Sequence, residues 1–314
     1  MNGLSFVASN RILTEKDIEP VCVVHANWVA LMPFGFMNSA TDPSLTFDTN
    51  WQWWGETTVG IQTTATLFEK KNIKRMLKPQ IWIKGGKFTG FIAMANDDDW
   101  KLLEQNYEDF ILHYAKLAQE ENIELFCLGT ELKLFVKNRP EFWISLISKI
   151  RTIYTGQLTY AANWDSYKQV SFWQHLDCIG IDAYFPLSMS ETPSVQALIE
   201  SWKTTKTALS TFSQNYQKSI IFTEYGYRSI DFCAQEPWDS EIQGNYNDTA
   251  QNNALTAMYA TFWNEPWFAG GFLWKWFDNH ADAGGIHHTG FTVQNKKSEH
   301  LVKQFYNYQT LTNE

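Results

Sequence analysis

The chain contains little cysteine. Its 314 residues include four, Cys22, Cys127, Cys178 and Cys233, which lie far apart, form no CxxC motif and have no histidine at a metal-ligand spacing. Disulfide frameworks are typical of small secreted domains with closely spaced cysteines. We therefore expect four reduced thiols, with Cys127 and Cys178 packing as small apolar side chains inside strands.

Positive charge is also scarce. The 25 Lys and Arg residues are outnumbered by 34 Asp and Glu residues, the net charge is −9, and no run of basic residues reaches four. Proteins that bind nucleic acid usually carry a basic patch or stripe. The charge balance therefore argues against a nucleic-acid partner.

No run of apolar residues approaches the length of 18 that a membrane-spanning helix needs, so we expect no membrane span. The first nine residues lack the basic and apolar regions of a signal peptide. As written, the chain is expected to be cytoplasmic. A chain whose export signal had been removed would look the same, so a periplasmic, surface or secreted location stays open.

Aromatic residues, in contrast, are abundant: they make up 16% of the chain and include 15 tryptophans. Flat aromatic rings stack on the apolar faces of pyranose sugars, so this surplus fits a carbohydrate ligand. A large core would use the same residues, and for any single tryptophan the two interpretations are equally good.

Short apolar runs alternate with longer amphipathic stretches, with no linker or change of composition between them. Eight runs predict strands, at residues 3–8, 28–33, 75–83, 124–130, 158–163, 177–183, 219–224 and 270–276. Helical stretches are predicted at 57–72 and 97–121, from Pro140, from Pro193, and at 253–262 and 298–308. This order predicts an α/β fold, a (β/α)8 TIM barrel forming a single domain over residues 1–314. A doubly wound open sheet is the alternative, but no glycine-rich phosphate loop follows the first strand.

Two glutamates stand where chemistry is expected in such a barrel. Glu131 follows the fourth predicted strand and Glu224 ends the seventh, each directly after a threonine. A lone glutamate at a strand end is more often a helix cap or an ion-pair partner. Two of them at the same rim of a parallel barrel supply the pair of carboxyl groups that hydrolysis of a glycosidic bond requires.

Several further residues are candidates for binding a substrate. Lys78, Gln80 and Trp82 alternate along the third predicted strand, which suggests polar contacts inside the barrel. Asn163 and Trp164 lie at the end of the fifth predicted strand.

Three more candidates belong to the sixth and eighth predicted strands. Asp182 could bind a sugar hydroxyl or only pair with Lys78. Trp274 and Trp276 alternate and should face the same side, either toward a sugar or toward the core. We expect Trp276 to lie nearer the mouth of the barrel.

A metal site is a weaker possibility. His280, Asp282, His287 and His288 cluster after the last predicted strand, but their spacing matches no ligand motif, and structural or substrate-contact roles are favoured. We expect no metal and no cofactor.

Four segments together resemble clan A glycoside hydrolases, and more narrowly glycoside hydrolase family 113, a family of retaining β-1,4-mannanases. They are Gly129-Thr130-Glu131-Leu132, Gly180-Ile181-Asp182-Ala183-Tyr184-Phe185-Pro186, Thr223-Glu224-Tyr225-Gly226-Tyr227 and Gly271-Phe272-Leu273-Trp274-Lys275-Trp276. The resemblance extends over nearly the whole chain.

The resemblance implies roles for particular residues. It implies that Glu131 is the acid/base and Glu224 the nucleophile, and that the Tyr184 hydroxyl touches Glu224. Trp274 or Trp276 would form the floor of the sugar subsite. Most of the clan has asparagine before the acid/base, whereas this chain has Thr130, so the usual role of that position is not carried over.

The function expected from the sequence is that of a retaining β-glycosidase, specifically a β-1,4-mannanase. It would cut mannan or manno-oligosaccharides by endo action or by a mixture of endo and exo action. Mannan as the substrate rests on the resemblance alone. The alternatives are a clan A hydrolase of another β-glycan, a catalytically silent carbohydrate-binding barrel and a metal-dependent hydrolase. We expect a monomer whose partner is an oligo- or polysaccharide.

Overall fold

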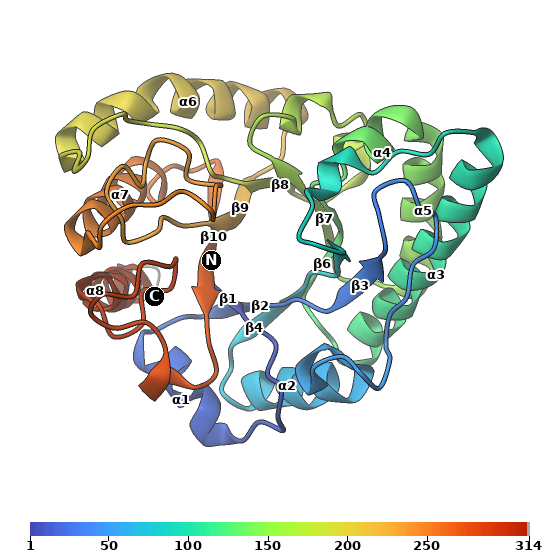
Figure 1. Cartoon of the computed structure of the whole chain (residues 1–314), viewed down its shortest axis with the longest axis horizontal. Helices are drawn as coiled ribbons and strands as arrows, with labels where there is room; N and C mark the ends of the chain where they lie inside the picture. The colour runs from blue at the N-terminus through green and yellow to red at the C-terminus, as the bar shows by residue number, and fades with distance from the viewer. Residues whose placement is uncertain (313–314) are drawn as a thin grey trace. The chain divides into compact units, whose positions relative to one another are not determined.

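Eight parallel strands close into a barrel in the order β1-β10-β9-β8-β7-β6-β4-β2. The computed structural model describes residues 1–312 (Figure 1). The barrel strands are β1 (Asn2–Phe6), β2 (Trp28–Leu31), β4 (Lys74–Leu77), β6 (Leu125–Thr130), β7 (Gln157–Asn163), β8 (Ile179–Asp182), β9 (Ile220–Tyr225) and β10 (Phe268–Trp276). The predicted (β/α)8 fold is confirmed.

Helices connect the strands, as the predicted alternation requires. They are α1 (Glu15–Val23), α2 (Thr58–Lys70), α3 (Asp97–Glu120), α4 (Lys133–Asn138), α5 (Pro140–Ile153), α6 (Val195–Tyr216), α7 (Asp248–Phe262) and α8 (Lys297–Thr312). Short 3-10 turns lie at η1 (Trp54–Glu56), η2 (Thr89–Phe91), η3 (Tyr167–Gln169), η4 (Trp173–His175) and η5 (His280–Asp282). The sequence did not predict α1 or α4. None of the helices within residues 1–312 is both long and apolar enough to cross a membrane.

Seven predicted strands agree with the observed ones to within two residues at each end, but the strand predicted at 75–83 is wrong. It consists of β4 and a separate strand, β5 (Gln80–Ile83), which pairs outside the barrel with β3 (Phe34–Met37). Proline has no N–H to donate to a ladder, and Pro79 lies at the break. The alternation of side chains continues through the proline, which is why the pattern did not reveal the break.

The chain divides into two compact units. One comprises residues 1–7, 14–29 and 182–314, and the other comprises residues 8–13 and 30–181. We call them the C-terminal unit and the N-terminal unit. The prediction of a single domain stays a prediction.

In the C-terminal unit, the two ends of the chain contribute neighbouring elements. The strands β1 and β10 form a parallel pair, and the ammonium group of Met1 donates to the carbonyl of Ala269 at 2.6 Å. The hydroxyl of Tyr225 lies 2.8 Å from that of Tyr306 on α8 and 3.2 Å from that of Tyr259 on α7. These buried bonds join β9 to two helices and satisfy hydroxyl groups that water cannot reach.

In the N-terminal unit, β6 and β7 form a parallel ladder beside an aromatic core. The ring of Trp143 contacts the rings of Tyr107 and Tyr160 edge-on, with centroids 5.4 and 5.5 Å apart. The helix α3 begins where Asn96 accepts a hydrogen bond from the N–H of Asp99, a typical N-cap. This packing fixes the end of β6, after which Glu131 follows.

The loops that follow β9 and β10 are tied together by a buried lysine. The ammonium group of Lys296 donates to the hydroxyl of Ser229 at 2.8 Å and to the carbonyl of Gly290 at 2.9 Å. Burial lowers the pKa of Lys296 from 10.5 to about 7, although the charge of Asp248 acts in the opposite direction.

This lysine should make the free energy of unfolding depend on pH in the alkaline range. Between pH 7 and 10.5 the unfolded chain binds a proton on Lys296 that the folded chain lacks, so this residue makes the free energy of unfolding rise with pH. We expect the melting temperature of the wild type, relative to that of Lys296→Met, to increase from pH 7 to pH 10. The same pH slope in both proteins would contradict the assignment.

Candidate active site

Glu131 is the first residue after β6, and the neighbouring strand β7 fixes its position. Its N–H donates to the carbonyl of Ala161 at 2.8 Å, and the next N–H, that of Leu132, donates to the hydroxyl of Tyr160 at 2.8 Å. Glu131 itself has a φ of 55°, in the left-handed region that a non-glycine residue rarely adopts. Such conformations persist only where the surroundings hold them, and they are common at functional sites.

Asn163 holds the side chain of Glu131. Its amide nitrogen donates to the Oε1 atom of Glu131 at 2.9 Å, from the last residue of β7. The sequence predicted Asn163 as a substrate-binding residue, and the structure places it directly on the predicted acid/base. Trp164, predicted with it, is half-buried immediately after β7.

Thr130, where most of clan A has asparagine, is the last residue of β6. Its hydroxyl oxygen is buried and makes no hydrogen bond. A buried hydroxyl without a partner costs free energy, so this atom is available to a polar group of a ligand.

Glu224 lies on β9, one residue before the strand ends. Phe222 and Tyr225 both pack on α7, with ring centroids 5.0 Å from Phe262 and 6.1 Å from Tyr259. Because these two residues are three apart, the strand departs from strict alternation, and its pairing with β10 shifts register here. The intervening Thr223 and Glu224 are therefore free to contact β8 and the residues after it.

Tyr184 and Asp182 supply those contacts. The hydroxyl of Tyr184 donates to the Oε2 atom of Glu224 at 2.9 Å, as the family resemblance implies. The hydroxyl of Thr223 donates to the Oδ1 atom of Asp182 at 2.8 Å. Tyr184, Asp182 and Glu224 are all buried, so the carboxylate of Glu224 is held in a fixed orientation.

The two tryptophans of β10 differ in their surroundings. The ladder pairs Leu4 with Leu273 and Phe6 with Trp276, so β10 has one residue more than β1 in this stretch. Leu273 and Trp276 therefore share a face, and the prediction that Trp274 and Trp276 do so is wrong. Trp276 is fully buried whereas Trp274 is half-buried, so Trp274 has the surface that a sugar could contact.

Lys275, between these tryptophans, is a residue that sequence analysis missed. Burial lowers its pKa, while the negative charge of Glu224 raises it. Its ammonium group lies 5.5 Å from the ring centroid of Trp274. A lysine between two tryptophans on a barrel strand was the available signal.

Gly226 was missed in the same way, although it lies in the quoted motif after Glu224. A Cβ atom at this position would come within 2.6 Å of the carbonyl oxygen of Trp274. The absence of a side chain therefore lets the segment that follows Glu224 approach Trp274 closely.

The remaining predicted residues are separated by the break at Pro79. Lys78 is fully buried just after β4, and its N–H donates to the carbonyl of Leu31 at 2.8 Å. Gln80 and Trp82 lie on β5, outside the barrel, and the side chain of Trp82 is 50% exposed. The expectation that all three point into the barrel is wrong for Gln80 and Trp82, and their binding to substrate stays a prediction.

Within residues 1–312, no three His, Cys, Asp or Glu side chains form a group that could hold a metal ion. Of the cluster after β10, His280 lies 2.7 Å from a carboxylate oxygen of Glu299. None of the four cysteines is in a disulfide.

The chain resembles proteins of known structure over almost its full length. A β-mannanase of glycoside hydrolase family 113 from Alicyclobacillus acidocaldarius, in complex with ManMIm, is 24% identical with a TM-score of 0.85, and the match covers 98% of this chain and 97% of that one. A complex of a β-1,4-mannanase of the same family is 21% identical with a TM-score of 0.85, covering 98% of both chains. These likenesses show the fold.

A more distant likeness is to a β-glucuronidase from Ruminococcus gnavus, in complex with a C6-substituted uronic isofagomine. It is 11% identical with a TM-score of 0.60, and the match covers 93% of this chain but 46% of that one. No curated protein matches the sequence.

The sequence model of Glycoside Hydrolase Family 113 matches residues 11–296, which include both glutamates and every residue that holds them. The chain therefore belongs to glycoside hydrolase family 113 and is a glycoside hydrolase with a (β/α)8 barrel.

Proposed function

We propose that the chain is a retaining β-1,4-mannanase in which Glu131 is the acid/base and Glu224 the nucleophile. The observation that carries the proposal is the placement of the two glutamates at the C-terminal ends of β6 and β9. Catalytic residues of TIM barrels come from this end of different strands. Each carboxylate also accepts a hydrogen bond from a side chain of the neighbouring βα unit, Asn163 or Tyr184.

The two glutamates divide the reaction between them. Glu131 gives its proton to the oxygen of the leaving sugar while Glu224 attacks the anomeric carbon, which breaks the glycosidic bond and forms a glycosyl-enzyme. Glu131, now a carboxylate, takes a proton from water, and that water cleaves the glycosyl-enzyme and restores Glu224. Two inversions at the anomeric carbon leave its configuration unchanged.

The hydrogen bonds of the site fit these roles. A nucleophile must keep one carboxylate oxygen aimed at the anomeric carbon, and the bond from Tyr184 fixes the other oxygen of Glu224. The bond from Asn163 fixes the orientation of the Glu131 carboxyl group, which carries the transferred proton in this scheme. The hydroxyl of Thr130 and the ring of Trp274 are candidates for contact with the sugar.

Mannan as the substrate is supported by family membership and by the β-mannanases that share the fold. Barrels of this kind also host enzymes for other β-glycans, so the polymer itself is part of the proposal. We propose a monomeric enzyme that needs no cofactor.

The division of roles is tested with variants of each glutamate on an aryl β-mannoside with a good leaving group. Glu224→Ala should lose turnover, and added azide should yield the α-mannosyl azide, because azide then attacks the substrate directly. Glu131→Ala should lose about 10²–10⁴-fold on mannan, and azide should yield the β-azide by attacking the glycosyl-enzyme.

A matched control is Glu120→Ala at the exposed end of α3, which should keep wild-type activity. Wild-type turnover in Glu224→Ala, or azides of the opposite anomeric configuration, would overturn the assignment.

The substrate is tested by offering oligosaccharides of β-1,4-mannan, glucomannan, xylan and cellulose and following the product anomers by NMR. We expect cleavage of mannan chains with products that first appear as the β-anomer. Products that first appear as the α-anomer would contradict a retaining mechanism. Preference for xylan or cellulose would contradict the mannanase assignment, and binding without cleavage would favour a silent carbohydrate-binding barrel.

A further inference from the structure

The two-stranded sheet formed by β3 and β5 has one buried face and one exposed face. Its register pairs Phe34 with Gln80 and Phe36 with Trp82, and these four side chains share a face. The alternate residues, including Met37, Ile81 and Ile83, are buried on the opposite face. The exposed face is therefore built of three aromatic rings and an amide.

Trp51 extends this face from the loop that follows β3. Its ring centroid lies 4.7 Å from that of Phe36, with the planes inclined at 65°. The ring of Trp82 contacts Phe34 edge-on at 6.3 Å. We call Phe34, Phe36, Trp51 and Trp82 the aromatic shelf. Trp51 is 58% exposed and Trp82 is 50% exposed, although burying the ring of either would lower the free energy of the protein.

A cavity of about 370 Å³ opens at this shelf, large enough for a sugar residue. Its walls combine the rings of Phe36, Trp51 and Trp82 with polar groups. The full lining is Phe36, Met37, Asn38, Ser44, Thr46, Trp51, Trp82, Lys84 and Gly85. No acid lines it and Lys84 is the sole charged side chain there, which suits a neutral ligand with many hydroxyl groups.

The position of the shelf relates it to Glu131. The strands β3 and β5 continue the paths of β2 and β4 beyond Pro33 and Pro79, where Lys78 and Gln80 donate backbone hydrogen bonds to Leu31 and Pro33. Four residues of strand extend roughly 13 Å. Since β5 also lies against β6, the shelf projects from the edge of the N-terminal unit at which β6 ends and Glu131 follows.

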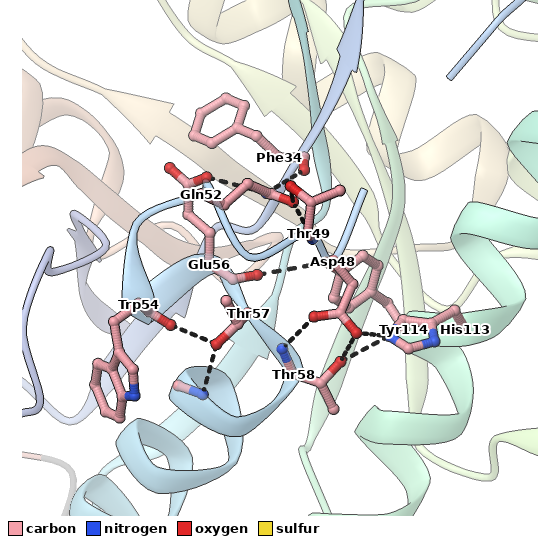
Figure 2. Close-up of polar contacts among 11 residues, drawn as sticks. Phe34, Asp48, Thr49, Gln52, Trp54, Glu56, Thr57, Thr58, His113 and Tyr114 are labelled. Atoms are coloured by element: carbon pink, nitrogen blue, oxygen red, sulfur yellow. Dashed lines mark hydrogen bonds and ion pairs between the residues drawn. The ribbon is translucent and has the colours of Figure 1, made fainter. Parts of the chain in front are cut away.

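A buried pair of side chains keeps the shelf in place. The amide nitrogen of Gln52 donates to the carbonyl of Phe34 at 3.0 Å and to the Oε2 atom of Glu56 at 3.1 Å, as Figure 2 shows. The amide oxygen of Gln52 accepts from the N–H of Thr49 at 2.9 Å. These bonds fasten the loop that carries Trp51 onto β3, so the rings are arranged before a ligand arrives, which reduces the entropic cost of binding.

We propose that the aromatic shelf is a sugar-binding surface separate from the catalytic residues, which holds a pyranose unit of a β-linked glycan chain at a distance from the bond that is cut. The proposal rests on the proposed function for its substrate class. The flat rings of Trp51 and Trp82 present apolar surface to a sugar ring, and Asn38, Ser44 and Thr46 can bond to its hydroxyl groups. The shelf thereby makes the enzyme prefer long chains.

The test compares long and short substrates in Trp51→Ala and Trp82→Ala. For each variant we measure kcat/KM on a mannohexaose and on an aryl β-mannoside, whose single sugar ring is the one that the catalytic residues must hold. We expect the loss on the hexaose to exceed the loss on the aryl mannoside by about tenfold, equivalent to one good stacking contact. Phe91→Ala is the control, because Phe91 is 65% exposed in the same unit but does not line the cavity.

Two further measurements complete the test. Gln52→Leu should raise KM for the hexaose and leave kcat unchanged, because it loosens the loop of Trp51 without removing a ring. The second is calorimetric binding of mannan, xylan and cellulose hexaoses to Glu224→Ala, with and without Trp82→Ala. The difference in dissociation constant gives the contribution of the shelf to binding without any hydrolysis.

The outcomes separate the shelf from the proposed function. Suppose that the wild type cuts mannan but kcat/KM of both tryptophan variants falls equally on long and short substrates, or does not fall. The proposal that the shelf binds sugar is then refuted, and the proposed function is unaffected. If mannan is not cut, but another glycan binds and Trp82→Ala weakens that binding, the sugar-binding role of the shelf is supported and the mannanase assignment is refuted. If no hexaose binds, the shelf is refuted.

Discussion

Hydrogen bonding between neighbouring parallel strands is the constraint on which this protein depends. Parallel strands have their C-terminal ends at the same end of the barrel. The residues that follow one strand are therefore held by the neighbouring strand or by the loop after it. Glu131 is fixed in a left-handed conformation because β7 accepts its N–H and Asn163 binds its carboxylate. Glu224 is fixed on β9 because the residue after it is anchored to two helices and Tyr184 binds its carboxylate. In both cases a donor from the neighbouring βα unit orients a glutamate, and that arrangement supports their roles as acid/base and nucleophile.

The same ladder continues beyond the barrel in one place. After Pro33 and Pro79 the paths of β2 and β4 separate from the barrel and pair again as β3 and β5. The barrel wall thus gains an extension with an apolar inner face and an aromatic outer face. If this extension binds sugar, as we propose, chain-length preference is built on strands that continue β2 and β4, whereas bond cleavage is built on β6 and β9. A glycoside hydrolase could then change its substrate length by altering the extension without disturbing the catalytic residues.

The sequence predicted the barrel and the two glutamates because apolar strands that end in carboxylates are local patterns. Apart from the contact of Tyr184 with Glu224, which the family resemblance implied, it did not predict what depends on partners distant along the chain. The alternation of Lys78, Gln80 and Trp82 was clear, but only pairing with β3 shows that the last two leave the barrel. Trp274 and Trp276 were expected to share a face, and a register shift against β1 separates them. Asn163 was expected to bind substrate, which stays a prediction, and its contact with Glu131 was not foreseen, because the turn after β6 brings the two side chains together only in the folded chain.

The central claim is that Glu224 forms a covalent bond to the sugar, and trapping that intermediate tests it most directly. A 2-deoxy-2-fluoro-mannosyl fluoride forms the glycosyl-enzyme faster than water removes it, so the labelled residue can be found by peptide mass spectrometry. We expect a single label, carried by Glu224, and protection by a manno-oligosaccharide. A label on Glu131 or on any other residue would contradict the account.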